Sequence, residues 1–188
     1  MSDASEEWST VHDRGRRFRP LGPVEKRVLA DLTAARRGRA LDVGCGTGEL
    51  AVFLAGLGHT VDAADFAPGA LRAARREHRD AVGVRWIRRD IERDGTEGLA
   101  AGGYHLITLR LVVAFLRDRE RVLRDLGRLL RPGGALVVVT PVAEYLPSER
   151  RHIALDTDEI ARLSQGWGES EQWDDRGTAI VVLRRGEG

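Results

Sequence analysis

The chain has 188 residues, of which 42% are hydrophobic and 31% are charged, and its formal net charge is +1. This length and composition are typical of one globular domain spanning residues 1–188, and they exclude a disordered or fibrous protein. The near-neutral charge argues against nucleic acid as a partner, and the absence of a ~20-residue apolar run or a signal peptide predicts a cytoplasmic protein without a membrane partner.

The first helix is predicted from Pro23 to Arg36, because apolar residues recur on one face and proline is favourable at a first helical position. A short apolar strand is expected next, from Arg39 to Asp42. The turn that follows contains three alternating glycines, Gly44, Gly46 and Gly48. Glycine takes positive φ and lets the backbone lie against a ligand, and the start of the next helix presents unpaired N–H groups. This stretch therefore predicts a nucleotide-cofactor turn.

Asp42 indicates which cofactor the turn accepts. A carboxylate at the end of the strand repels the pyrophosphate of a dinucleotide, whereas it attracts the ammonium of an amino-acid moiety. The dinucleotide fingerprint also requires glycine where this chain has Glu49. Cys45 is the only cysteine, so an internal disulfide is excluded. We interpret Cys45 as a small residue that fits the turn, with a reactive thiol as the alternative.

The string Leu-Asp-Val-Gly-Cys-Gly-Thr-Gly at residues 41–48 resembles the first motif of the class I S-adenosylmethionine-dependent methyltransferases. The string Leu-Arg-Pro-Gly-Gly-Ala-Leu at residues 130–136 resembles the turn before the fifth strand of the same family. With the elements described below, the resemblance covers roughly residues 22–185. It implies S-adenosyl-L-methionine as cofactor and S-adenosyl-L-homocysteine as product. The cofactor contacts that it implies in the turn are Asp42, Gly44, Cys45, Gly46 and Gly48.

The family resemblance also implies the fold. We expect a small single-domain α/β protein, a three-layer Rossmann-like sandwich around a seven-stranded, mostly parallel sheet. The expected strand order is 3-2-1-4-5-7-6, with strand 7 antiparallel. Residues 22–188 would form this core. Residues 1–21 carry Trp8, His12 and Phe18, and they would close over the site as a lid or substrate segment; packing of these aromatics as satellites of the core is the alternative.

The second strand is predicted over residues 59–65 and ends at Asp65. An acid at this position of a βαβ unit can accept hydrogen bonds from both ribose hydroxyls, and it matches the second motif of the resembled family. The resemblance also places Phe66 against the adenine face. A helix follows to about His78.

The third strand is predicted over residues 84–89, and Asp90 and Ile91 come after it. The resemblance implies that Asp90 accepts the adenine amine while Ile91 packs on the ring; an aspartate that merely starts a turn is the alternative. Asp42, Asp65 and Asp90 thus all lie at the carboxyl ends of predicted parallel strands, which is the edge where doubly wound sheets bind ligands.

The second half of the chain supplies the remaining elements. A loop over residues 92–103 precedes a fourth strand, 104–109, with Arg110 at its carboxyl end beside the proposed cofactor. The next helix is predicted to be capped by Asp118 and to carry one apolar stripe, Val122, Leu123, Leu126, Leu129 and Leu130. Residues 131–134 should end it sharply before an apolar fifth strand, 135–140.

The last part of the chain begins with an irregular link over residues 141–155. A helix should follow with Asp156 or Thr157 as its cap. Two strands, 168–173 and 178–183, are then predicted to pair through a turn at 174–177.

Candidates for the acceptor site lie in the link and in the N-terminal segment. Transfer of an activated methyl needs mainly alignment, so the absence of a catalytic triad does not exclude an enzyme. The candidate residues are Arg110, Tyr145, Glu144 and His152, with His12 or Trp8 from the N-terminus. His152 is the candidate general base, because histidine exchanges protons near neutral pH; a solvent-exposed loop histidine is the alternative. No cluster of metal ligands stands out in the sequence.

The identity of the acceptor is the least constrained part of the interpretation. No Asn-Pro-Pro-aromatic string follows the fourth strand, as it does in amino methyltransferases of nucleic acids or proteins, so we expect a small-molecule acceptor with an oxygen, nitrogen or carbon nucleophile. Two other classes stay open. A methyltransferase-like binding protein without turnover would carry the same cofactor motifs, and an NAD(P)-dependent oxidoreductase is disfavoured by Asp42 and Glu49. The sequence does not indicate an oligomeric state.

Overall fold

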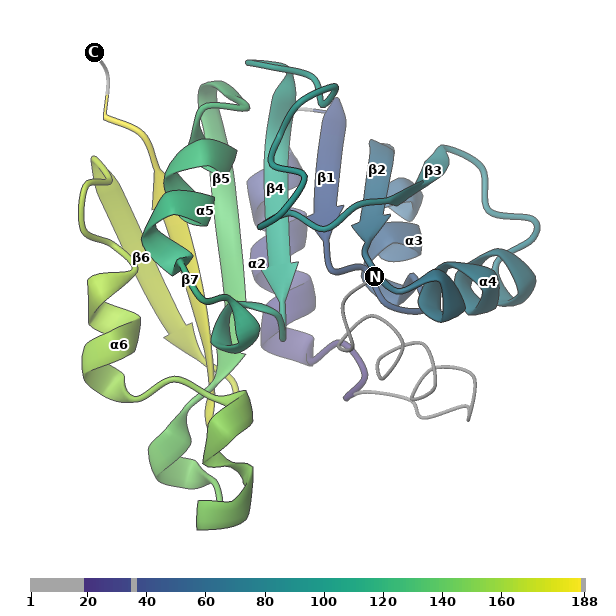
Figure 1. Ribbon diagram of the computed structural model, residues 1–188. Helices are drawn as coiled ribbons and strands as arrows, with labels where there is room; N and C mark the ends of the chain where they lie inside the picture. Colours follow the sequence, from purple (N-terminus) through teal and green to yellow (C-terminus); the bar gives the residue numbers. More distant parts are fainter. Residues whose placement is uncertain (1–18, 35–36, 187–188) are drawn as a thin grey trace.

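A seven-stranded sheet forms the centre of the computed structural model, which describes residues 19–34 and 37–186 (Figure 1). The strand order is β3-β2-β1-β4-β5-β7-β6, and β7 runs antiparallel to both of its neighbours while the other pairs are parallel. The predicted order and the antiparallel seventh strand are therefore confirmed.

The strands are β1 (Arg39–Val43), β2 (Thr60–Asp65), β3 (Val84–Arg88), β4 (Tyr104–Arg110), β5 (Leu130–Pro141), β6 (Glu169–Asp174) and β7 (Thr178–Arg184). The helices are α2 (Pro23–Ala34), α3 (Glu49–Gly56), α4 (Pro68–Glu77), α5 (Arg119–Gly127) and α6 (Thr157–Arg162), with short 3-10 helices η1 (Val113–Phe115), η2 (Ala143–Tyr145) and η3 (Ser148–Ile153). The predicted end of the first helix at Arg36 lies outside the described residues.

Helices cover both faces of the sheet, and Figure 1 shows α5 and α6 in front of it with α2 and α3 behind. Each face has its own apolar core. Leu29 of α2 and Leu54 of α3 belong to the core that contains Val137 of β5, whereas Leu126 of α5 belongs to the core that contains Val138. Successive residues of β5 thus point into opposite cores, which explains why residues 135–139 of this strand are all apolar.

The region between α5 and the regular part of β5 differs from the prediction. The helix ends at Gly127, and β5 already begins at Leu130, which pairs with Tyr104. The next pair in register is Leu106 with Ala135, so residues 131–134 form a bulge at the start of the strand instead of a sharp turn outside it. The predicted extension of the helical stripe to Leu130 was wrong, because pairing with β4 draws this residue into the sheet.

Several ends of elements follow from local chemistry. Asp156 is the N-cap of α6 and forms a capping box with Glu159, which settles the choice between Asp156 and Thr157. Gly58 follows α3 with φ 94°, the left-handed conformation that commonly ends helices. None of the helices in the described part of the chain has the length and apolar character that crossing a membrane requires.

Candidate active site

The glycine turn joins β1 to α3 at the carboxyl edge of the sheet, which faces downward in Figure 1. Gly44, Gly46 and Gly48 have φ of 69°, 54° and 89°, so all three adopt the left-handed conformation expected from the sequence. The amides of Gly44 and Cys45 both donate to the Ala64 carbonyl of β2, at 2.8 and 3.0 Å. The turn is therefore anchored to the neighbouring strand.

Two of these glycines are also required by packing within the protein. A Cβ atom at Gly44 would lie 2.3 Å from Cγ2 of Val112, in the segment after β4. A Cβ atom at Gly48 would lie 2.3 Å from the Trp86 ring of β3. The absence of a Cβ atom at Gly44 and Gly48 thus lets Val112 and Trp86 pack directly against the turn.

Asp42 is a buried carboxyl group directly before the turn, with a relative exposure of 1%. Its Oδ1 accepts a 2.8 Å hydrogen bond from the Thr108 hydroxyl of β4, while no described group donates to its buried Oδ2. Burial raises the pKa of Asp42 to about 7, although the Thr108 hydrogen bond and the charge of Arg110 act in the opposite direction. A buried carboxylate with a free acceptor atom fits an ammonium group supplied by a ligand.

Asp65 ends β2 and lies within reach of the same turn. Its Oδ2 accepts from the Gly46 amide at 2.9 Å, and its Oδ1 accepts from the Ala67 amide at 2.8 Å. These two bonds hold the carboxylate beside the glycine turn, at the carboxyl end of β2. Phe66 is the next residue and is half-buried. The ribose role of Asp65 and the adenine contact of Phe66 stay predictions.

We expect the Asp65→Ala variant to lower the affinity for S-adenosylmethionine about tenfold to a hundredfold, because two charge-assisted hydrogen bonds to ribose would be lost. It should also reduce the free energy of unfolding by about 1–3 kcal/mol, because the Gly46 and Ala67 amides lose their acceptor. Calorimetric titration and urea unfolding measure the two effects, with the exposed Asp80→Ala as control. Unchanged affinity would show that the ribose does not lie at Asp65.

Asp90 and Ile91 follow β3. Oδ1 of Asp90 accepts from the amides of Glu92 and Arg93, at 3.1 and 3.3 Å, so this side chain shapes a turn. Ile91 is buried in the core beneath α5. Asp90 thus starts a turn, as the alternative interpretation of the sequence expected. The adenine contacts of Asp90 and Ile91 stay predictions.

Cys45 is buried in the core of the α2 and α3 face. Burial raises the pKa of its thiol above the ordinary value, and the nearby carboxylates of Asp65 and Asp42 act in the same direction. A neutral, buried thiol is a poor nucleophile. The packing favours the interpretation of Cys45 as a small residue that fits the turn.

Arg110 lies at the carboxyl end of β4 and forms a buried ion pair that the sequence did not predict. Its Nε lies 2.7 Å from Oε1 of Glu25 in α2, and the two side chains are 11% and 3% exposed. A second guanidinium nitrogen donates to the Arg19 carbonyl at 2.6 Å. Arginine carries five N–H donors, so donors are left for a ligand. The predicted cofactor and catalytic roles of Arg110 stay predictions.

Residues 19–22, here named the N-terminal strap, cross the sheet edge beside this ion pair. Arg19 donates to the Asp175 carbonyl at 3.1 Å and to the Thr178 hydroxyl, both near the turn between β6 and β7. The Leu21 amide donates to Oε1 of Glu49 at 3.2 Å. Glu49 is the first residue of α3, directly after the glycine turn. The strap therefore connects the cofactor turn to the far half of the sheet.

The acceptor candidates of the link do not form one cluster of interacting side chains. Tyr145, in η2, is 71% exposed, and His152, in η3, is also exposed. Glu144 accepts hydrogen bonds from the amide and hydroxyl of Thr157, both at 3.0 Å, and these bonds hold its pKa below the ordinary range. Glu144 thus supports the start of α6. Trp8 and His12 lie outside the described residues, as do residues 1–18 of the predicted lid.

A second buried aspartate, Asp62 in β2, was not selected by the sequence analysis. It accepts hydrogen bonds from Arg39, at 2.9 Å, from Arg85, at 2.7 Å, and from the Tyr104 hydroxyl, at 2.6 Å. Burial opposes ionisation of this group, but these donors outweigh burial and lower its pKa. The only signal in the sequence was an acid inside an otherwise apolar strand. Both oxygens of Asp62 accept hydrogen bonds from side chains of the protein, whereas Oδ2 of Asp42 has no described donor and can accept from a ligand.

The described residues contain no group of three or more His, Cys, Asp or Glu side chains that could hold a metal ion. His105, at the start of β4, accepts from the Arg39 amide at 3.3 Å and contacts Arg131. It lies at the opposite end of β4 from Arg110, away from the glycine turn.

The sheet order, the glycine turn and the acid before it define the class I S-adenosylmethionine-dependent methyltransferase fold. A family model described as "Methyltransferase domain" matches residues 41–136, about half of the chain. The chain belongs to this methyltransferase family, whose cofactor is S-adenosylmethionine.

Curated relatives share the central part of the chain. A malonyl-[acyl-carrier protein] O-methyltransferase of Enterobacter lignolyticus is 32% identical over 124 residues, which are 66% of this chain and 47% of the relative. A ubiquinone biosynthesis O-methyltransferase of Xanthomonas campestris is 32% identical over 123 residues, 64% of this chain and 50% of the relative. The chain thus spans about half the length of the curated relatives that it matches.

Solved structures support the fold over nearly the whole chain. A candidate S-adenosyl-L-methionine-dependent methyltransferase of Methanococcus maripaludis superposes with a TM-score of 0.73 at 16% identity, covering 98% of this chain and 93% of the other. An O-methyltransferase family protein of Burkholderia thailandensis gives a TM-score of 0.70 at 19% identity and covers 98% of this chain and 60% of the other. At these identities the likeness concerns the fold alone.

Proposed function

We propose that this protein transfers the methyl group of S-adenosylmethionine to a small-molecule acceptor by in-line displacement. The observation that carries the proposal is Asp42, a buried carboxyl group with a free Oδ2 directly before the left-handed glycine turn. The ammonium of the methionine moiety is a suitable donor to this oxygen. A dinucleotide would place no cation beside Asp42. Binding of NAD(P) would therefore not explain why its buried Oδ2 lacks a donor.

The residues of this chain would hold the cofactor and exclude water. Asp42 would bind the amino group, the turn at Gly44, Gly46 and Gly48 would accommodate the cofactor backbone, and Asp65 would accept from the ribose. Phe66, Asp90 and Ile91 would border the adenine. The cofactor supplies an already activated methyl group, so alignment of the acceptor is the main contribution required from the protein.

An oxygen nucleophile is the acceptor atom that the comparisons favour, because both curated relatives described above are named O-methyltransferases. A hydroxyl acceptor loses a proton during transfer, so a general base that removes this proton would accelerate the reaction. His152 is our candidate for that base. Tyr145 and Arg110 would orient the acceptor at the carboxyl edge of the sheet. The cytoplasmic location expected from the sequence stays a prediction.

Calorimetric titration with S-adenosylmethionine, S-adenosylhomocysteine and NAD tests the cofactor. We expect micromolar binding of the first two ligands and none of NAD. Binding of NAD alone would overturn the interpretation of Asp42 and with it the proposed function. Release of S-adenosylhomocysteine in the presence of hydroxylated small molecules then tests turnover, and a protein that binds the cofactor without releasing product on any acceptor would be a non-catalytic binding protein.

The acceptor site is tested with three variants, His152→Ala, Tyr145→Phe and Arg110→Ala. We expect His152→Ala to lower kcat about a hundredfold or more for a hydroxyl acceptor, because a positioned base contributes at least this factor. Tyr145→Phe should raise KM for the acceptor. Cofactor affinity is measured in parallel, and His59→Ala, far from the carboxyl edge of the sheet, is the histidine control. Full turnover in all three variants would place the acceptor elsewhere.

A further inference from the structure

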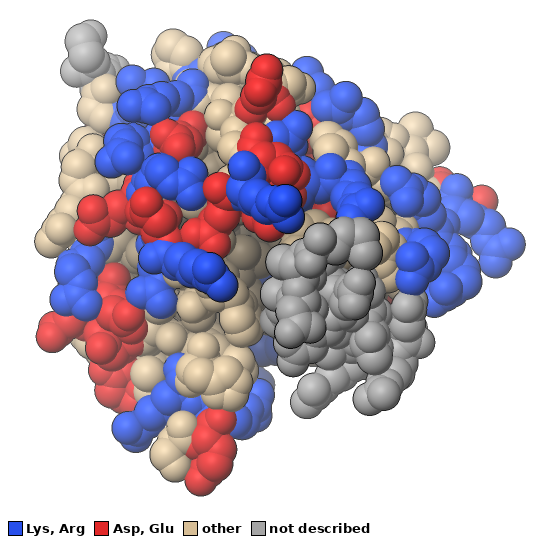
Figure 2. Space-filling view, viewed as in Figure 1, with Lys and Arg blue, Asp and Glu red and all other residues tan. Residues whose placement is uncertain are grey.

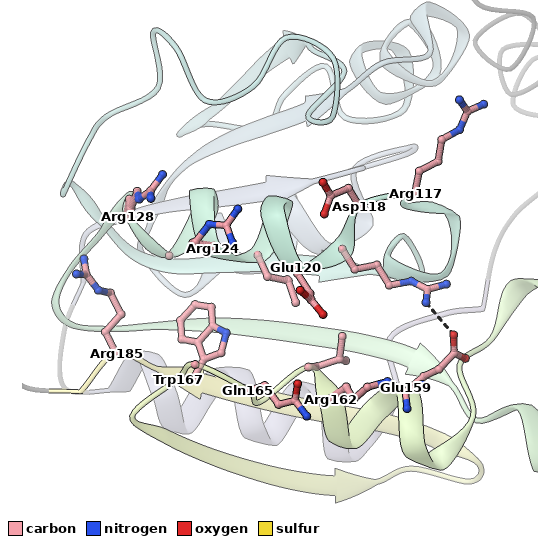
Figure 3. A pocket seen from close by; sticks show the side chains of 15 residues that line it. Arg117, Asp118, Glu120, Arg124, Arg128, Glu159, Arg162, Gln165, Trp167 and Arg185 are labelled. Carbon is pink, nitrogen blue, oxygen red and sulfur yellow. Dashed lines mark hydrogen bonds and ion pairs between the residues drawn. The ribbon is translucent and has the colours of Figure 1, made fainter.

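A cleft of about 720 Å³ lies between α5 and α6, on the face of the sheet opposite to α2 and α3 (Figure 3). Its lining comes from residues 117–128, from residues 159–167 and from Arg185. None of the residues assigned to the cofactor or the acceptor lines it. The cleft therefore requires an explanation separate from methyl transfer.

Arginine dominates the rim of this cleft. The lining includes six arginines, Arg117, Arg119, Arg124, Arg128, Arg162 and Arg185. Arg119 pairs with Glu159 at 2.8 Å, and Arg128 pairs with Asp125 at 2.9 Å. Among the described residues, the side chains of Arg117, Arg124, Arg162 and Arg185 form no ion pair or hydrogen bond. Of the acidic residues that line the cleft, Glu120 alone has a side chain without such a partner in the described part of the chain. The rim thus offers an excess of unpaired positive charge.

The floor of the cleft is apolar. It contains Leu123 of α5 and Leu163, both buried, and the half-buried ring of Trp167. The ring lies so close to α5 that a Cβ atom at Gly127 would be 2.9 Å from it. An apolar centre with an aromatic anchor inside an arginine rim is the anatomy of protein-binding hot spots.

The charges are spread along the cleft and do not converge on one point. Figure 3 shows Arg117 at one end and Arg128 and Arg185 at the other, with Trp167 below α5 near Arg185. The nine residues of α5 alone extend roughly 13 Å, at about 1.5 Å for each residue. Figure 2 shows basic and acidic side chains intermixed on the face of the molecule that carries α5 and α6 in Figure 1. A compact anion would contact only part of such a rim, whereas a helix of a partner protein could follow it.

We propose that the cleft between α5 and α6 docks an acidic amphipathic helix of a partner protein. Carboxylates along that helix would pair with Arg124, Arg162 and Arg185, and an apolar side chain would enter the hollow at Trp167. The four unpaired arginines favour an acidic partner by charge complementarity, and the apolar floor favours a helix with one apolar face.

The test uses the full chain and a fluorescein-labelled helical peptide that presents glutamates and a pair of leucines on one face. Fluorescence anisotropy measures its binding to the wild-type protein and to the triple variant Arg124→Glu, Arg162→Glu and Arg185→Glu. The matched control reverses three exposed arginines elsewhere, Arg27, Arg76 and Arg79, and so changes the net charge by the same amount. Circular dichroism establishes that both variants are folded.

We expect the triple variant to weaken binding of the peptide about tenfold to a hundredfold, because three attractive ion pairs become repulsive. The control variant should bind as the wild type does. A peptide with serines in place of the leucines should also bind more weakly, because it lacks the apolar contact with Trp167.

Three outcomes would overturn the proposal. One is absence of peptide binding, or equal loss of binding in both variants. Another is displacement of the peptide by an equal concentration of inorganic pyrophosphate at fixed ionic strength, which would assign the cleft to small anions. The third is a dimer of the wild-type protein in sedimentation velocity that dissociates in the Arg124, Arg162 and Arg185 triple variant but not in the control variant. This result would assign the cleft to a second copy of the chain.

Discussion

Replacing Asp42 by asparagine is expected to stabilise the unliganded protein while weakening its binding of S-adenosylmethionine about tenfold or more. Burial raises the pKa of Asp42 from an ordinary 3.8 to about 7, so the ionised form is costly in the folded state. Asparagine keeps an acceptor for the Thr108 hydroxyl and removes this cost. We expect a gain of about 1–3 kcal/mol in the free energy of unfolding at about pH 8, after the penalty of burying the amide.

The pH dependence identifies the cause of this stabilisation. An acid with a raised pKa in the folded state favours folding at low pH, and this contribution is lost as the pH rises from about 4 through about 7. The gain from Asp42→Asn should therefore be small near pH 4.5 and large near pH 8 in urea unfolding. Cofactor affinity is measured by calorimetry on the same samples. An equal change in stability at both pH values would contradict the assignment to ionisation of Asp42.

Asp62 provides the matched control, because it is buried in the neighbouring strand but paired with Arg39, Arg85 and Tyr104. These donors lower its pKa despite burial. Its contribution to stability is present above the ordinary pKa of aspartate and is lost as the pH falls through the lower folded value. The Asp62→Asn variant should thus lose stability near pH 8, where Asp42→Asn gains it.

The Glu25→Ala variant is expected to lower the free energy of unfolding by about 3–5 kcal/mol, because the guanidinium of Arg110 would be left buried without its partner. The pair is 2.7 Å apart, and both side chains are nearly inaccessible to solvent. The Glu25 carboxylate also accepts from the Gly22 amide at 3.2 Å, so the strap should loosen and KM for S-adenosylmethionine should rise. Urea unfolding and initial-rate kinetics measure the two effects.

Two further variants separate burial from charge. Asp125→Ala breaks the exposed pair with Arg128, at 2.9 Å, and should cost less than about 1 kcal/mol. The double variant Glu25→Leu with Arg110→Met should regain most of the stability lost in Glu25→Ala, because no unpaired charge is left buried. If the Glu25→Ala and Asp125→Ala variants were equally stable, the ion pair at the strap would not be a buried contact in solution.

The sheet and the cofactor turn were predictable because their signals are local. The glycine turn, the apolar fifth strand and the acids at strand ends each occupy a few consecutive residues, and the resemblance to class I methyltransferases then supplied the strand order. The end of α5 was predicted wrongly because helical periodicity continues to Leu130, whereas pairing with Tyr104, 26 positions away, determines where that residue lies.

The long-range contacts at the strap and in the α5 and α6 cleft could not be predicted from local patterns. Glu25 and Arg110 are separated by 85 positions in the sequence, and nothing in the residues around either one indicates the other. Likewise, nothing in the local sequence around the arginines of α5 and α6 indicated that Trp167 would lie beside them in one cleft. Long-range pairs of this kind depend on tertiary packing, which a single sequence does not express.

The position of β7 between β5 and β6 has a consequence for synthesis of the chain. β6 is translated before β7 but pairs with β7 alone, so it has no place in the sheet until β7 emerges from the ribosome. During the same interval the outer edge of β5 is unpaired, because residues Leu136 to Val139 pair on that side only with Ile180 to Leu183 of β7. An open, β-branched edge is a template for pairing with other chains. The nascent chain is therefore most exposed to aggregation in the interval between synthesis of β5 and synthesis of β7.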